Sequence, residues 1–131
     1  DPLPEEVLDF LVKTSFLSRL NAELCNAVTG RDDSKAMLTW IERHNLFLSA
    51  LDEQGYWFRY HPLLQENLRT MLQQNNDIDR KQLHELASHW FVEQKLWSEA
   101  VRHALSASRC IAPYRTAQAL SHWRKKGISI P

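Results

Sequence analysis

His61 stands where two sequence patterns meet, and its side chain is the first candidate for chemistry. In "YWFRYHPLLQENLR", residues 56 to 69, the pattern alternates before the His61-Pro62 pair and takes helical spacing after it. Serine, threonine or aspartate would be the ordinary cap of a helix that a proline opens. A helix N-terminus presents free N–H groups and a positive dipole end, so an imidazole N–H placed there could extend toward an anion. The alternative is that His61 only caps its own helix or packs beside Tyr60.

The histidines of "HELASH" are candidates for a zinc site. A zinc-protease helix needs two histidines four residues apart, on one face. His84 and His89 are five residues apart, which turns one away from the other. The chain has no GxSxG elbow and no convincing acid pair, and its three glycines are too dispersed for a phosphate loop. The sequence therefore predicts no enzyme, no metal site and no cofactor bound by this chain alone.

Charge is balanced overall but divided along the chain. Lysine plus arginine number 16 and aspartate plus glutamate 16. Residues 1–66 hold 11 acids and 6 bases, net −5, whereas residues 67–131 hold 5 acids and 10 bases, net +5. The usual interpretation is two differently solvated surfaces, and a weak polar docking face is the other.

Composition favours a cytoplasmic fragment with a real core. Hydrophobic residues make up 44% of the 131-residue chain, and no apolar run approaches the length of a membrane span. Cys25 and Cys110 follow no metal or redox spacing, which favours reduced, buried thiols. The start "DPLPEEVLDF" has no methionine and is not a signal peptide, so we expect a fragment of a longer protein.

Residues 1–74 are expected to form one domain of helices and a hairpin. Helix signals occur at Pro4-Glu5-Glu6, at Asn21 as a cap with Gly30 as a stop, and at Asp32, Asp33 or Ser34 as a third cap. The third helix is expected to bury Met37, Trp40, Ile41 and His44.

The period then changes to that of a β-hairpin. "LFLSALDEQGYWFRY", at about residues 46 to 60, contains two β-rich runs around Asp52-Glu53-Gln54-Gly55, with Tyr56, Phe58 and Tyr60 on one face. The helix that Pro62 opens should point Leu64, Leu68, Met71 and Leu72 inward. Three helices followed by a hairpin is the order of a winged helix. A four-helix bundle with an extra hairpin is the competing layout.

Residues 79–131 are expected to form a helical arm. Apolar positions favour a helix over residues 79–95, with a face made by Leu83, Leu86, Ala87, Trp90 and Phe91, and a second helix whose face contains Ala100, Val101, Ala104 and Leu105. A last helix is expected at residues 113–126. The predicted fold class is therefore mainly α: a winged helix followed by a helical pair and a terminal helix.

Three blocks resemble the MalT-like regulators, which are large ATP-binding transcription factors of the LuxR type within the STAND class. The blocks are "FLVKTSFLSRLNAELCNAVTG", "IERHNLFLSALDEQGYWFRYHPLLQENLR" and "LHELASHWFVEQKLWSEAVRHAL", in order, over roughly residues 8 to 108. The resemblance implies a winged helix that follows a nucleotide-binding domain and leads into a helical sensor arm. It also implies ATP or ADP in the parent protein, and DNA reading by a separate C-terminal module.

The helical pair is also similar to a tetratricopeptide repeat. Its packing positions are matched by Ala87, Phe91, Trp97, Ala100, Ala104 and Ala107, and the pattern departs at His84 and Ser88, where tryptophan and glycine are usual. An isolated repeat cannot bury both its faces, so the arm should continue into a further structure.

The resemblance also gives His61 a role. "RYHPLL" resembles the "MHD" segment of related signalling ATPases, with Tyr60 and Pro62 in place of methionine and aspartate, which implies that His61 contacts the β-phosphate of ADP. The leading hypothesis is a regulatory winged helix that holds the resting ADP state of the parent. One alternative is an interaction scaffold without nucleotide linkage. The other, a directly DNA-binding winged helix, is disfavoured because acids match the bases of the third helix and occupy the wing tip.

Overall fold

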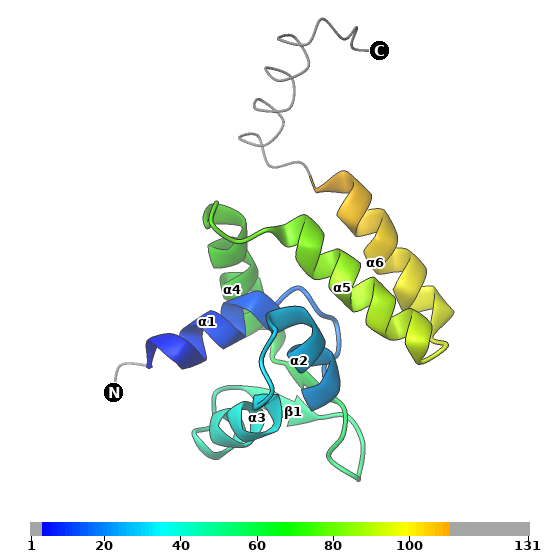
Figure 1. The fold of residues 1–131 in the computed structure, drawn as a ribbon. Coiled ribbons are helices and arrows are strands. Elements are labelled where there is room, and N and C mark those ends of the chain that lie inside the picture. Colours follow the sequence, from blue (N-terminus) through cyan, green and yellow to red (C-terminus); the bar gives the residue numbers. More distant parts are fainter. Residues whose placement is uncertain (1–3, 111–131) are drawn as a thin grey trace, which may run out of the picture.

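The computed structural model describes residues 4–110, and the expected helix at 113–126 lies outside the described residues. Figure 1 shows the helices, with α1 crossing α4 and the pair α5 and α6 lying side by side. The elements are α1 Glu5–Thr14, α2 Ala22–Thr29, α3 Ser34–Arg43, β1 Leu48–Ala50, β2 Phe58–Tyr60, α4 Pro62–Gln74, α5 Arg80–Glu93 and α6 Trp97–Arg109. This is the predicted order of a winged helix followed by a helical pair.

The caps of α2 are those that the sequence predicts. The Asn21 side chain accepts a hydrogen bond from the Leu24 N–H at 2.8 Å, and Gly30 ends the helix in the left-handed region at φ 75°. The start of α3 is different. Asp33 occupies the cap position, but its carboxylate pairs with Arg31, and the Ser34 N–H donates instead to the Asn26 side chain at 3.1 Å.

The hairpin forms with shorter strands and a longer connection than expected. β1 and β2 are antiparallel, with Leu48 opposite Tyr60 and Ala50 opposite Phe58. Residues 51–57 connect the two strands. Within this connection, the Asp52 carboxylate accepts hydrogen bonds from the Tyr56 and Trp57 N–H groups at 2.8 and 3.0 Å. Tyr56 therefore lies in the connection and not on the strand, contrary to the expected alternation.

An isolated β-bridge joins the hairpin to the loop between α1 and α2. Leu20, between α1 and α2, exchanges two backbone hydrogen bonds of 2.8 Å with Phe58. Tyr60 is fully buried, and its hydroxyl lies 2.7 Å from the Thr14 hydroxyl of α1. Both contacts fix the end of β2, and thereby the first residue of α4.

One continuous apolar core runs through the winged helix and into α5. Its largest fully buried apolar and aromatic members are Phe10, Leu11, Leu17, Leu20, Leu24, Ile41, Tyr60 and Phe91. Two sequence expectations fail at its edge. His44 is exposed and stacks on half-buried Trp40 at 3.7 Å, and Met71 is exposed, because Leu68 and Leu72 already fill the space beneath α4.

The arm packs α6 on α5 through small side chains. Ala87 and Phe91 of α5 and Ala100 of α6 belong to the core, Ala107 of α6 is also buried, and the Ser88 hydroxyl donates to the Ala100 carbonyl at 2.7 Å. The prediction of which face of α6 is buried is wrong, because the helix is rotated about its axis relative to the expected orientation. Its buried positions are Ala100, His103 and Ala107, whereas the larger apolar side chains point outward: Trp97, Val101 and Leu105.

A cluster of side chains fixes the arm against the winged helix. Arg19 forms a bidentate ion pair with Glu99 of α6, and its guanidinium lies 3.9 Å from the ring centre of Trp57. Trp57 in turn meets the edge of Trp90 at 6.0 Å. Among residues 4–110, no helix is both long and apolar enough to cross a membrane.

Candidate functional site

His61 is the N-cap residue of α4 and lies at the surface. Its N–H donates to the Phe47 carbonyl at 2.7 Å, so the backbone of the hairpin sets its position. Its ring Nδ1 lies 3.1 Å from the Leu63 N–H and accepts that hydrogen bond. The capping role that the sequence allowed for His61 is therefore present in the structure.

The capping bond also fixes the ring's proton. A nitrogen that accepts from a backbone N–H carries no hydrogen, so the neutral imidazole must hold its proton on Nε2. The Nε2–H is then a donor at the positive end of the helix, where the dipole favours a negative partner. Capping and anion binding are compatible here, since each uses a different ring nitrogen.

Exposed apolar side chains surround this donor. Phe47 is 63% exposed and Leu63 is 64% exposed, and the rings of Phe47 and His61 lie 5.7 Å apart. Phe47 also adopts a positive φ of 58°, which is costly for a bulky side chain and is often found at functional positions. We call Phe47, His61 and Leu63 the cap patch. Its chemistry suits a contact with another protein surface.

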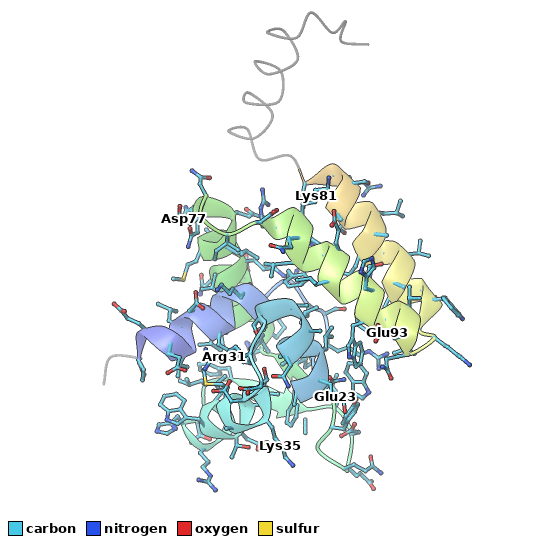
Figure 2. All side chains as sticks on the ribbon, viewed as in Figure 1. Glu23, Arg31, Lys35, Asp77, Lys81 and Glu93 are labelled. Atoms are coloured by element: carbon cyan, nitrogen blue, oxygen red, sulfur yellow. The ribbon has the colours of Figure 1, made fainter. Side chains whose placement is uncertain are left out.

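Acidic side chains offset much of the positive charge on and beside the third helix. Lys35 lies at the surface of α3 (Figure 2), and exposed Arg43 stands beside exposed Glu42. Arg31, just before the helix, is neutralised by Glu6 and Asp33. The guanidinium in turn holds the Asp33 pKa below its usual value. Little positive charge therefore remains for phosphate contacts.

A second candidate site, a pocket, lies at the other end of α4. A pocket of about 330 Å³ opens between the loop after α1, the C-terminal half of α4, the start of α5 and the C-terminal half of α6. We call it the junction pocket. Three arginines line it, one from each helix: Arg69, Arg80 and Arg102. The lining contains no carboxylate.

Two histidines form the inner wall of the junction pocket. The Nδ1 atoms of His84 and His103 lie 2.9 Å apart, so one donates to the other. His103 is 4% exposed and stacks on Phe91 at 5.5 Å, while its Nε2 is buried with no partner among the described residues. Burial, followed by the positive charge of Arg80 and Arg69, lowers the His84 pKa to about 4. Burial, followed by His84 and Arg102, lowers the His103 pKa to about 4 as well.

The structure separates the two histidines of "HELASH". His84 faces the junction pocket, whereas His89 is exposed. Within residues 4–110, no group of three or more histidine, cysteine, aspartate or glutamate side chains is placed to hold a metal ion. The pairing of His84 with His103 was missed by the sequence analysis. One signal was present, because His103 lies three residues after Ala100 and four before Ala107, on the buried face of α6.

Comparison with known proteins identifies the family. The family model of the MalT winged helix domain matches residues 1–81. The chain belongs to this family. The MalT-like resemblance and the winged-helix fold predicted from the sequence are thereby confirmed.

Two relatives extend the similarity into the arm. Two proteins named HTH-type transcriptional regulator MalT, from two strains of Klebsiella pneumoniae, are each 39% identical over 115 residues, which covers 82% of this chain. The chain spans 13% of the length of these relatives. It corresponds to a segment of a MalT-like regulator and not to a whole one.

Proposed function

We propose that this chain is the regulatory winged helix of a cytoplasmic, ATP-dependent transcriptional regulator. It links an upstream nucleotide-binding domain to a downstream helical sensor and holds the resting, ADP-bound state. The observation that carries the proposal is the exposed His61, whose capping bond leaves an Nε2–H donor at the start of α4. The MalT winged-helix family supplies the regulatory context.

The residues at the start of α4 suit a phosphate contributed by another domain. ADP, held by the nucleotide-binding domain, supplies a β-phosphate anion. In this chain His61 donates toward it, and the Phe47 carbonyl and the Leu63 N–H orient the imidazole. A single donor cannot bind a nucleotide alone, so the contact stabilises ADP only when the two domains are docked.

The cap patch supports such docking. Phe47 and Leu63 expose apolar surface beside the donor, which a partner domain would remove from water. The patch is small, so the docked and released states can differ by only a few kcal/mol, as a switch requires. DNA binding in this proposal belongs to a separate C-terminal module of the regulator.

The arm supports a connection to a downstream helical domain. Trp97, Val101 and Leu105 form an exposed apolar stripe on the side of α6 that faces away from α5. A single helical pair of the repeat type leaves one face without a neighbour. A following helix of the sensor would cover this stripe.

The test uses the regulator that contains this chain. His61→Ala should speed ADP release and raise inducer-independent transcription, because the donor is lost. His61→Asn keeps an acceptor for the Leu63 N–H but has a shorter side chain, so it should also release ADP faster while the helix stays capped. His89→Ala, at an exposed position on α5, is the matched control.

Two outcomes would contradict the proposal. If the folded His61→Asn variant retains ADP and keeps the basal activity of the wild type, His61 is only a cap. If the regulator shows no nucleotide dependence at all, the chain is an interaction scaffold.

Direct DNA binding is tested separately, and we expect no sequence-specific complex of this chain in a gel shift at physiological salt. A sub-micromolar, competitor-resistant complex would support the DNA-binding alternative.

A further inference from the structure

We propose that the junction pocket is a binding site for a small phosphate dianion, either free phosphate or the phosphate group of a monoester. The pocket is separate from the cap patch, and the inference does not depend on the contact between His61 and ADP. It rests on three arginines and a histidine pair that line one cavity whose lining contains no carboxylate.

The positive charge of the pocket has no negative counterpart in its lining. Arg69 donates to the main-chain carbonyls of Ser15 and Phe16 at 2.9 and 3.3 Å, so it is fixed by neutral acceptors. Arg80 also lines the pocket, and its positive charge helps to lower the His84 pKa. Arginines that face a cavity without a carboxylate favour an anion, and their planar groups match phosphate oxygens bidentately.

Arg102 has only a weak carboxylate neighbour. Its guanidinium lies 3.8 Å from Glu99, but Glu99 already accepts both bonds of Arg19. The same arginine donates to the Ser18 hydroxyl at 3.3 Å. Because Glu99 is shared between two arginines, the net charge around the pocket stays positive.

The histidine pair supplies a donor whichever proton arrangement it adopts. If His84 donates its Nδ1–H, His103 carries its proton on the buried Nε2, which has no partner within the described residues. If His103 donates, His84 carries the Nε2–H. Each neutral arrangement therefore leaves one Nε2–H that does not bond to the other histidine, on a ring that lines the pocket.

Size and ligand chemistry favour a small anion over a metal ion. A volume of about 330 Å³ is enough for a small ligand, since ligand pockets typically range from about 300 to 1,000 Å³. A cation would meet three arginines, and the described residues offer no third metal ligand beside the two histidines. Serine and glutamine side chains on the rim, from Ser18, Ser106 and Gln73, can bind the remaining phosphate oxygens.

Binding is tested by titration calorimetry of the purified chain. Inorganic phosphate and glucose 6-phosphate are the two probes, which separate a free phosphate from a phosphate ester. Glucose is the neutral control, and sodium chloride at matched ionic strength controls for screening. We expect saturable binding of at least one phosphate probe, and no saturable binding of glucose or chloride.

The variants assign the binding to the pocket. Arg80→Gln and Arg102→Gln should each weaken phosphate binding at least tenfold, whereas Arg59→Gln, at an exposed position on β2, should leave it unchanged. Arg69 is avoided because it also holds the loop after α1. Without phosphate, Arg80→Gln should unfold at the temperature of the wild type or higher, because a like charge is removed. Phosphate should raise the unfolding temperature of the wild type more than that of the variant.

Three results would overturn the proposal. The first is phosphate binding no stronger than that of chloride at matched ionic strength, and the second is full affinity in Arg80→Gln. The third is saturable zinc binding that requires His84 and His103 and is not displaced by phosphate, because the pocket would then be a cation site.

Discussion

The two anion sites proposed at the two ends of α4 are built in different ways. At the N-terminus, His61 is one exposed donor, set by a local bond to the Leu63 N–H. At the C-terminal half, Arg69 belongs to a pocket whose other cations come from α5 and α6. The first site is encoded in a few consecutive residues and, in the proposed function, acts only against a partner domain. The second is assembled from four segments and can act within the chain.

The two sites should also differ in how much they contribute to the stability of the fold. The cap patch exposes Phe47 and Leu63, so it contributes little to the stability of the fold. The junction pocket is built against the core, since His103 stacks on Phe91 and meets the edge of Phe16. Substitutions should therefore damage stability behind the pocket and leave it nearly intact at the patch.

The largest effect is expected for Phe91→Ala. Phe91 is 1% exposed and supports both Trp90 and His103 through ring contacts at 5.3 and 5.5 Å. Removing it should lower the free energy of unfolding by about 3–5 kcal/mol in a urea titration. Leu63→Ala, in the cap patch, should change it by no more than about 0.5 kcal/mol. Equal losses of unfolding free energy at the two sites would show that the patch belongs to the core, and the proposed difference in stability would be wrong.

Much of the fold was predictable because its signals are local. The cap Asn21 and the stop Gly30 follow from short-range chemistry and form as expected, and the hairpin within residues 46–60 forms with shorter strands than expected. The face of α6 was not predictable in this way. Its alanines could pack on either side, and the observed rotation is the one that places His103 against His84 and Phe91.

The two candidate sites differ in the same respect. His61 was found because the period changes at a single His-Pro pair. The junction pocket was not found, since Arg69, Arg80 and Arg102 have no sequence relation until three helices bring them together. The net +5 of residues 67–131 was no guide to it, because residues 67–110 hold six bases and five acids, net +1. Charge alone does not show where the cations meet.

The second prediction concerns pH and the histidine pair. Both histidines have a folded pKa of about 4, below the value of about 6.5 for an unperturbed imidazole. The unfolded chain therefore binds more protons between these values, so the free energy of unfolding should fall as the pH drops from about 6.5 to about 4. The charged groups that face the pair are Arg69, Arg80 and Arg102, which lower the histidine pKa values. Glu99 acts in the opposite direction and raises the pKa of His103.

Variants isolate the histidine contribution to this slope. His84→Gln and His103→Gln should each flatten the fall in stability between pH 6.5 and 4, while carboxylates that titrate in the same range remain in every variant. The matched control is His89→Gln, at the exposed histidine of the same helix as His84. A slope that stays as steep in both pocket variants as in the wild type would show that the pair does not titrate as its surroundings imply.

The smallest effect is expected at the start of α4, and it separates capping from signalling. His61→Ala removes the acceptor of the Leu63 N–H and should cost about 0.5–1 kcal/mol of unfolding free energy, near the lower range for a lost N-cap. His61→Asn restores a good cap residue, so its stability should equal or exceed that of the wild type in the same urea titration. A cap defect would then appear only in the alanine variant, whereas loss of the Nε2–H appears in both. If the asparagine variant is as unstable as the alanine variant, the ring of His61 supports the fold through its contact with Phe47. The start of α4 would then contribute to folding stability, as the residues behind the junction pocket do.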